Sequence, residues 1–237
     1  ANITLTAPAA LTVTAVQDSV SCGGASDGAI TATGSGGSGT FQFSIDGTNF
    51  QTGTQFTGLT AGPYTVTVQD GNSCTATASV TVLEPTPLTI SLAQDSASCN
   101  GVADGVITVT ASSAAGGLEY STDGTNFQVS NVFSGLSAGP FTVTVRDANL
   151  CLTTANITVG EPVALTATAL QDSVSCGGAA DGVITVTAAG GSPNYTYANG
   201  AGAPQASNVF TGLTAANYTI NVTDGTSCTA QVNIAVL

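Results

Sequence analysis

The stretch Gln17-Asp18-Ser19-Val20-Ser21-Cys22-Gly23-Gly24-Ala25-Ser26-Asp27-Gly28 decides how the chain is organised, because it occurs three times. It returns with few changes at residues 94–105 and 171–182, a step of 77 residues each time. A fixed period of this kind is the signature of a repeat protein, so the sequence predicts three copies of one structural unit. Later anchors keep the same step: Asp70, Asp147 and Asp224, and Cys74, Cys151 and Cys228.

Glu-Pro pairs mark the boundaries between the copies, at Glu84-Pro85 and Glu161-Pro162. Ala7-Pro8 stands at the corresponding place in the first copy. A chain of this length would otherwise suggest one or two larger domains. Because the repeat is the stronger signal, we predict three small domains instead. The predicted domains are residues 7–83, 84–160 and 161–237.

Residues 1–6 precede the first copy and resemble residues 155–160, at the end of the second copy. Two interpretations follow. Residues 1–6 are the last strand of a preceding repeat, or they are a donated strand that leaves its own chain and completes the sheet of a neighbour. Strand donation would make the protein a self-polymerising filament subunit.

Short stretches of alternating apolar and polar residues, separated by Gly and Asp turns, predict an all-β fold. Residues 64–68 are the clearest such strand, and Asp46-Gly47 is typical of a hairpin turn whose glycine has a positive φ. About seven strands per copy fit an immunoglobulin-like β-sandwich. Because the copies are joined with almost no linker, we expect them to dock end to end as a stiff rod.

Two further positions receive a structural interpretation. Tyr64, with Phe141 and Tyr218 at the equivalent places, is interpreted as a ring that fills the core. Since Phe141 has no hydroxyl, we do not expect the backbone hydrogen bond of a tyrosine corner. Gly28 follows Asp27, and we expect it to need a positive φ in an Asx turn.

Six cysteines in small repeats predict disulfides, because a small unit buries a modest core and gains from a covalent link. We expect one disulfide inside each copy, since this pairing keeps the same separation every time. Cys74 to Cys99 is rejected, because these residues flank two successive strands that run on in one direction. The predicted pairs are Cys22–Cys74, Cys99–Cys151 and Cys176–Cys228. Such regular disulfides also indicate a protein outside the cytosol.

The charge balance is strongly acidic, with 14 Asp and Glu residues, the single basic residue Arg146 and a formal net charge of -13. Nucleic acid and anionic membrane surfaces require Lys or Arg, so neither is an expected partner. No apolar run has transmembrane length, so we expect no direct membrane insertion by this segment. The chain lacks an initiator Met and a signal peptide, and we expect a mature or excised segment.

Several segments, in this order along the chain, resemble the SprB repeat, a family that builds large surface adhesins of Bacteroidetes. They are Asp18-Ser19-Val20-Ser21-Cys22, Asp27-Gly28, Asp46-Gly47-Thr48-Asn49-Phe50, the segment from Phe56 to Val68, and Asp70 before Cys74. The resemblance covers all three copies, although the third copy departs from it at residues 215–218, which lack the glycine. It implies a secreted, cell-surface fibre with an adhesive or gliding-related role.

The sequence gives little support for an enzyme. There is no His for a general base or a zinc site and no Lys for a Schiff base. Asp18 and Asp27 form a candidate carboxylate pair for glycoside hydrolysis. Because the pair recurs in every copy, a role in the fold is more economical than a triplicated active site.

Calcium is the candidate ligand at the loops, because hard carboxylate oxygens suit this ion. The expected internal disulfide would draw together the two loops that carry these aspartates, and Glu84 and Glu161 could each add a ligand. No other cofactor is expected. The candidate ligands are Asp18, Asp27, Asp70, Asp95, Asp104, Asp147, Asp172, Asp181 and Asp224.

A serine after the first aspartate of each repeated stretch matches the Asp-Ser/Thr-apolar motif of general O-glycosylation in Bacteroidetes. The candidate sites are Ser19, Ser96 and Ser173. The alternative is a turn capped by the side chain at the end of a strand.

Taken together, these features predict an extracellular, adhesive repeat fibre at a bacterial cell surface. Its expected partners are other copies of itself, surface glycans or other cell-surface components. The first alternative is the self-polymerising filament subunit. The second is a carbohydrate-binding module, although the sequence has no Trp and only five Tyr to form a sugar-binding platform.

Overall fold

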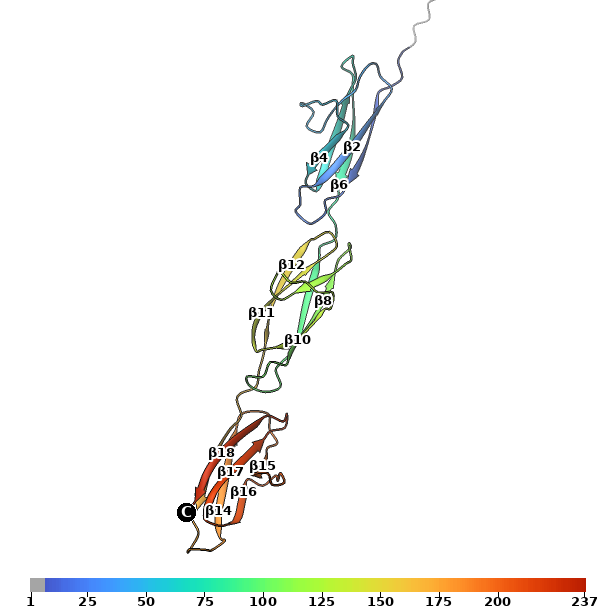
Figure 1. Ribbon diagram of the computed structural model, residues 1–237. Coiled ribbons are helices and arrows are strands. Elements are labelled where there is room, and N and C mark those ends of the chain that lie inside the picture. Colours follow the sequence, from blue (N-terminus) through green and yellow to red (C-terminus); the bar gives the residue numbers. More distant parts are fainter. Residues whose placement is uncertain (1–6) are drawn as a thin grey trace, which may run out of the picture. The chain divides into compact units, whose positions relative to one another are not determined.

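The computed structural model describes residues 7–237, and these residues form strands and no helix (Figure 1). The first copy contains β1 (Thr12–Asp18), β2 (Gly28–Ser35), β3 (Gln42–Ser44), β4 (Gln55–Leu59), β5 (Gly62–Gln69) and β6 (Thr75–Val82). The second contains β7 (Thr89–Asp95), β8 (Gly105–Ser112), β9 (Glu119–Ser121), β10 (Val132–Leu136), β11 (Gly139–Arg146) and β12 (Leu152–Val159). The third contains β13 (Thr166–Asp172), β14 (Gly182–Ala189), β15 (Thr196–Asn199), β16 (Val209–Leu213), β17 (Ala216–Thr223) and β18 (Thr229–Val236).

The prediction of an all-β fold is confirmed, but the count of about seven strands per copy is wrong, because each described copy has six. The segment between β3 and β4 is a turn, with one isolated bridge between Phe43 and Gln51. The predicted turn conformation is confirmed, because Gly47 has φ 73°. The Asp46 carboxylate accepts hydrogen bonds from the backbone N–H groups of Thr48 and Asn49, at 2.9 and 2.7 Å.

Two antiparallel three-stranded sheets make up the first copy, in the orders β1-β2-β4 and β3-β5-β6. Ile30 of β2 and Val66, Val68 and Val82 of the second sheet share one core cluster and are essentially inaccessible to solvent. Successive side chains of a strand point to opposite faces, which is why Val66 and Val68 are buried while Thr65 is exposed. The two sheets therefore form an immunoglobulin-like β-sandwich.

The same topology recurs in the other copies. The sheet orders are β10-β8-β7 and β12-β11-β9 in the second copy, and β13-β14-β16 and β15-β17-β18 in the third. Ile184, Ile220, Val222 and Val236 lie in the core of the third copy, at the positions equivalent to those named in the first.

Gly28 does not have the positive φ that the Asx-turn interpretation predicts. It is the first residue of β2 and is buried. A Cβ atom at this position would lie 2.6 Å from Cγ1 of Val82 and 2.9 Å from the carbonyl oxygen of Leu59. Gly105 and Gly182 meet the same obstacles in the other copies. The glycine is therefore required by a close approach between the sheets, and not by its backbone angle.

Tyr64 fills the edge of the core as expected, but its hydroxyl also makes the hydrogen bond that we did not expect. It donates to the backbone carbonyl of Thr60 at 3.0 Å, and Tyr218 donates in the same way to Thr214 at 2.9 Å. This is the contact of a tyrosine corner. Phe141 in the second copy cannot make it, so the ring is common to all copies and the hydrogen bond to two.

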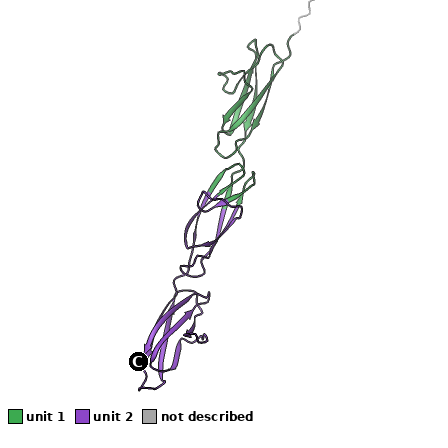
Figure 2. Ribbon diagram, viewed as in Figure 1, with its two compact units in different colours: residues 1–90, 111–119, 145–153 green, residues 91–110, 120–144, 154–237 purple. Residues whose placement is uncertain are grey.

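The described chain divides into two compact units (Figure 2). Among the described residues, one unit contains residues 7–90, 111–119 and 145–153, and the other contains residues 91–110, 120–144 and 154–237. The division passes through the second copy, so the domain boundaries at 7–83, 84–160 and 161–237 stay a prediction, as does the stiff rod. Residues 1–6, the predicted preceding or donated strand, lie outside the described residues.

Candidate functional site

Disulfides join consecutive copies. Cys22 is bonded to Cys151 and Cys99 to Cys228, and each bond has an S–S distance of 2.04 Å, a Cα–Cα distance of 5.6 Å and a sequence separation of 129 residues. Cys74 and Cys176 are free and exposed. The prediction of one disulfide inside each copy, Cys22–Cys74, Cys99–Cys151 and Cys176–Cys228, is therefore wrong.

The physical reason is that the two cysteines of one copy lie at opposite ends of its sandwich. Cys74 directly precedes β6, while Cys22 lies in the loop that follows β1. That loop is next to the far end of β6, because the Val20 N–H donates to the Leu83 carbonyl at 3.1 Å. A strand of eight residues spans about 26 Å, far beyond the roughly 4.4–6.8 Å between Cα atoms that a disulfide tolerates.

The cysteines thus fall into two kinds. The loop cysteines lie between the first two strands of each copy: Cys22, Cys99 and Cys176. The turn cysteines directly precede the last strand: Cys74, Cys151 and Cys228. Each disulfide joins the loop cysteine of one copy to the turn cysteine of the next copy.

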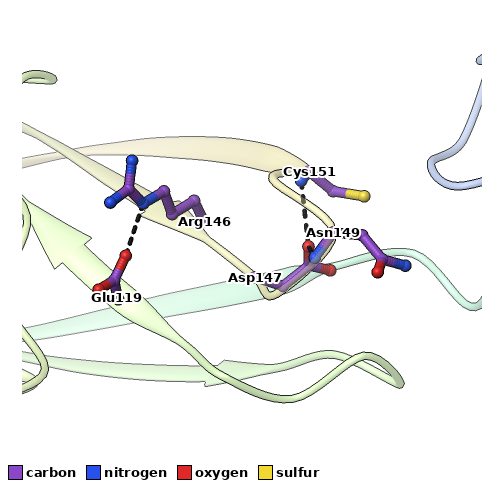
Figure 3. Close-up of polar contacts among 5 residues, drawn as sticks. All are labelled: Glu119, Arg146, Asp147, Asn149 and Cys151. Atoms are coloured by element: carbon purple, nitrogen blue, oxygen red, sulfur yellow. Dashed lines mark hydrogen bonds and ion pairs between the residues drawn. The ribbon is translucent and has the colours of Figure 1, made fainter.

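An aspartate carboxylate stabilises the backbone turn in which each turn cysteine lies. The Asp147 carboxylate accepts from the backbone N–H groups of Asn149 and Cys151, both at 3.0 Å (Figure 3). Leu150 between them has φ 65°, in the left-handed region that is strained for a side chain of this kind. The carboxylate thus stabilises the tight backbone conformation that presents the Cys151 sulfur.

The same turn occurs at Asp70 and Asp224. The Asp70 carboxylate accepts from the N–H groups of Asn72 and Cys74, both at 2.9 Å, and from the Ser38 N–H at 2.9 Å. Burial acts to raise the pKa of Asp70, but these backbone hydrogen bonds outweigh it, so the pKa lies below its usual value. At Asp224, hydrogen bonds from the N–H groups of Ser192, Cys228 and Thr226 lower the pKa in the same direction against burial.

A second aspartate holds each loop cysteine. The Asp27 carboxylate accepts from the Ser21 N–H at 2.9 Å, one residue before Cys22. The equivalent distances are 2.8 Å from Ser98 to Asp104 and 3.0 Å from Ser175 to Asp181. In all three loops, hydrogen bonds from the hydroxyl and the backbone N–H of the serine lower the pKa of the aspartate.

Further hydrogen bonds surround the first disulfide. The Asn149 side-chain amide donates to the Ser21 carbonyl at 3.3 Å, and the Gly24 N–H donates to the Glu84 carboxylate at 2.9 Å. Around the second disulfide, Thr226 Oγ1 donates to the Ser98 carbonyl at 3.4 Å, and the Gly101 N–H donates to Glu161 at 2.7 Å. Each junction is therefore a small polar interface with the disulfide inside it.

The predicted calcium ligands are not brought together. Asp18 and Asp27 lie at the end of the sandwich that carries Cys22, whereas Asp70 lies at the opposite end beside Cys74. Among residues 7–237, no group of three or more His, Cys, Asp or Glu side chains could hold a metal ion. The hydrogen bonds above give Asp27, Asp70 and their counterparts, Asp104, Asp147, Asp181 and Asp224, a role in the loops and turns. Asp18, Asp95 and Asp172 end the first strand of each copy and are exposed.

The candidate glycosylation sites Ser19, Ser96 and Ser173 directly follow those three aspartates and are exposed. Each hydroxyl lies 3.4–3.5 Å from the side-chain oxygen of the glutamine two residues before it: Gln17, Gln94 and Gln171. Both the modification and the capped turn stay predictions.

Arg146, the only basic side chain of the sequence, forms an ion pair with Glu119 at 2.6 Å (Figure 3). Its charge is therefore neutralised locally.

The first copy has a pocket of about 540 Å³ lined mainly by threonine, glycine, Phe41 and Phe43. Phe43 is buried, and its ring meets that of Phe41 edge to face, with centroids 6.5 Å apart and an interplanar angle of 64°. The Phe43 ring therefore packs in the core and does not offer an open face on which a sugar could stack.

The SprB repeat family matches residues 14–50 and 168–202, in the first and third copies. This finding confirms the predicted resemblance in these two regions. No curated protein matches the chain. No helix among residues 7–237 is long and apolar enough to cross a membrane.

Solved structures similar to the chain include fragments of titin and of intimin. The I-band fragment I67–I69 of titin has a TM-score of 0.37 and 11% identity, with 98% of this chain and 99% of the fragment covered. The C-terminal 282-residue fragment of intimin, in complex with the intimin-binding domain of its translocated receptor, has a TM-score of 0.31 and 16% identity. The match covers 73% of this chain and 57% of the intimin fragment, so the chain spans just over half of that fragment's length. Because these scores are low, the architecture rests on the strand pairing of the chain itself.

Proposed function

We propose that the chain is part of an extracellular, adhesin-like fibre at a bacterial surface, and that disulfides between consecutive repeats limit its extension under force. The single observation that carries the proposal is the pair of overlapping disulfides, Cys22–Cys151 and Cys99–Cys228. Two supporting features are the match to the SprB repeat and the use of disulfides, which persist outside the cytosol. The role is structural, and we assign no catalytic residue.

The two disulfides close segments of the chain that overlap in the sequence. Cys99 lies within the segment closed by Cys22–Cys151, and Cys151 lies within the segment closed by Cys99–Cys228. A force applied at Ala7 and Leu237 therefore follows the chain to Cys22, crosses to Cys151, runs backwards to Cys99 and crosses to Cys228. Residues 23–98 and 152–227 lie outside this path, and neither segment can be fully extended while both bonds are intact, because the shorter segment between Cys99 and Cys151 becomes taut first.

The length of that path gives a quantitative expectation. It contains 15 residue steps up to Cys22, 52 between Cys151 and Cys99, and nine after Cys228, against 230 steps from Ala7 to Leu237 in the reduced chain. At about 3.4 Å per extended residue, the fully unfolded oxidised chain reaches about 270 Å and the reduced chain about 780 Å. The disulfides thus restrict the extension to about one third.

Single-molecule force spectroscopy of the chain, held at Ala7 and Leu237, tests this proposal. We expect a final length of about 270 Å without reductant and about 780 Å with it. The variant Cys22→Ser retains one disulfide and should reach about 350 Å, because only Cys99–Cys228 then shortens the path. If the oxidised and reduced chains extend to the same length, the disulfides do not limit extension and the proposed mechanical role is wrong.

Strand donation through residues 1–6 has less support as an assembly mechanism. β6, β12 and β18 complete the second sheet of their own copies, so none of the three described sandwiches needs a strand from another chain. For this reason we assign the assembly of the fibre to the cysteines. Surface glycans or other cell-surface components remain the proposed adhesive partners.

A further inference from the structure

Cys74 and Cys176 occupy the same places in their copies as the bonded cysteines but have no disulfide partner. By the step of 77 residues, Cys74 is equivalent to Cys151 and Cys228, and Cys176 is equivalent to Cys22 and Cys99. Both equivalents of each free cysteine are bonded, always loop cysteine to turn cysteine. The described chain therefore leaves unpaired one turn cysteine, Cys74, and one loop cysteine, Cys176.

The backbone around both free cysteines already has the bonded conformation. The Cys74 N–H is 2.9 Å from the Asp70 carboxylate, and the corresponding distances are 3.0 Å for Cys151 and 2.9 Å for Cys228. The residue before each turn cysteine has a positive φ: Ser73 66°, Leu150 65° and Ser227 73°. At Cys176, the Ser175–Asp181 hydrogen bond reproduces the one that precedes Cys22. Neither conformation depends on the disulfide.

The free sites also lack the cover that a partner provides. Cys74 and Cys176 are exposed, whereas Cys228 retains 8% of its accessible surface. The Asn149 side chain donates to the Ser21 carbonyl of the preceding copy, but its equivalent, Asn72, has no side-chain hydrogen bond among residues 7–237. The turn half of the junction interface is thus present at Cys74, and the Asn72 side-chain amide is available there as a hydrogen-bond donor.

We infer that Cys74 and Cys176 are coupling sites of opposite kind, at which a further repeat of this type is attached by a disulfide. Cys74 takes the loop cysteine of a preceding repeat, and Cys176 takes the turn cysteine of a following repeat. Because a second copy of this chain carries both kinds, it can be coupled head to tail, through Cys176 of one copy and Cys74 of the next. This inference concerns assembly and holds whether or not the fibre resists force.

The chemistry is thiol–disulfide exchange with a small-molecule disulfide such as oxidised glutathione. The thiolate of one cysteine attacks the glutathione disulfide, forms a mixed disulfide and releases one glutathione thiolate. The thiolate of the second cysteine then attacks the protein sulfur of the mixed disulfide and releases the other glutathione. Two protein thiols are oxidised and one glutathione disulfide is reduced to two thiols, so atoms and electrons balance.

Two single variants of the full chain test the inference. Cys176→Ser keeps only the turn site Cys74, and Cys74→Ser keeps only the loop site Cys176. Each variant is incubated alone, and both are incubated as a concentrated mixture, in a glutathione redox buffer. We expect disulfide-linked dimers in the mixture and none in either variant alone, with a Cys74–Cys176 peptide in the non-reduced digest. A control variant, Cys74→Ser/Cys176→Ser/Thr77→Cys, carries its free thiol at an exposed position of β6 outside the turn. It should give no dimer with the Cys74→Ser variant, which keeps only Cys176.

Two outcomes would overturn the inference. One is dimer formation by each variant alone to the same extent as in the mixture, which would show unselective thiol chemistry. The other is a mixture in which both cysteines acquire glutathione but no protein–protein disulfide forms. The mass of the reduced protein from its native source distinguishes the origin of the attached repeat: a mass near that of this chain indicates separate chains, and a much larger mass indicates repeats within one polypeptide.

Discussion

At the scale of single residues, the cysteine sites depend on aspartates that act through the backbone. Asp70, Asp147 and Asp224 accept hydrogen bonds from the turn that carries a cysteine, and Asp27, Asp104 and Asp181 do so in the loop. The repeat made these residues conspicuous in the sequence, but it could not distinguish a metal ligand from a carboxylate that caps a turn. That distinction depends on which end of the sandwich each residue occupies.

The variant Asp70→Asn tests the role of these carboxylates without altering a bonded cysteine. The pKa of Asp70 is lowered in the folded chain, so the unfolded chain takes up the proton first as the pH falls. Its contribution to stability is therefore present above about pH 4 and is lost as the pH falls through the lower folded pKa. We expect Asp70→Asn to lower the melting temperature at pH 7 and to reduce its loss between pH 5 and pH 2.

The matched control is Asp18→Asn, because Asp18 is exposed and its side chain makes no hydrogen bond among residues 7–237. Melting temperatures of both variants and the parent chain, measured by circular dichroism across this pH range, provide the comparison. Equal pH dependence in the parent and in Asp70→Asn would contradict the assigned role.

Gly28→Ala tests the close approach between the sheets of the first copy. The added Cβ would lie 2.6 Å from Val82 and 2.9 Å from the Leu59 carbonyl, and overpacking of this kind costs about 1–3 kcal/mol. We expect faster hydrogen exchange at the buried amides of β2 and β6, with the third copy unchanged as an internal reference. Gly53→Ala is the control, because its nearest neighbour would lie at an ordinary 3.5 Å. Equal exchange rates in the two variants would contradict the packing explanation.

At the scale of strands and turns, the sequence predicted what depends on local pattern. The alternating residues of β5, the positive φ of Gly47 and the three equivalent sets of strands all follow from spacing and turn chemistry. The predicted disulfides inside each copy are wrong because the spacing of the cysteines in the sequence does not show in which direction the strands between them run. Val20 and Leu83 meet at one end of the sandwich, and Cys74 precedes β6 at the other, so only the path of the strands separates the two cysteines of a copy.

The tyrosine corner was missed for a related reason. Phe141 showed that the second copy does without the hydroxyl, and the sequence offered no way to see that the Thr60 and Thr214 carbonyls lie within reach in the other copies. A ring with a hydroxyl can therefore fill the same space as Phe141 and add a backbone contact.

At the scale of the whole molecule, the disulfides make the stability of one copy depend on the next. A disulfide that closes a segment of about 130 residues lowers the conformational entropy of the unfolded chain. In the chain-entropy account this raises the free energy of unfolding by roughly 5 kcal/mol. Because each bond links a loop to the turn of the following copy, this stabilisation belongs to a pair of copies and not to one of them. Reduction should consequently weaken the junctions as well as the individual sandwiches.

The central claim is the pairing of the cysteines between copies, and peptide mapping tests it most directly. The non-reduced chain is digested between the cysteines, under acidic conditions that prevent exchange, and the linked peptides are identified by mass spectrometry. We expect peptides that join Cys22 to Cys151 and Cys99 to Cys228. Peptides that join Cys22 to Cys74 and Cys176 to Cys228 would contradict the claim and, with it, the proposed function and the coupling sites.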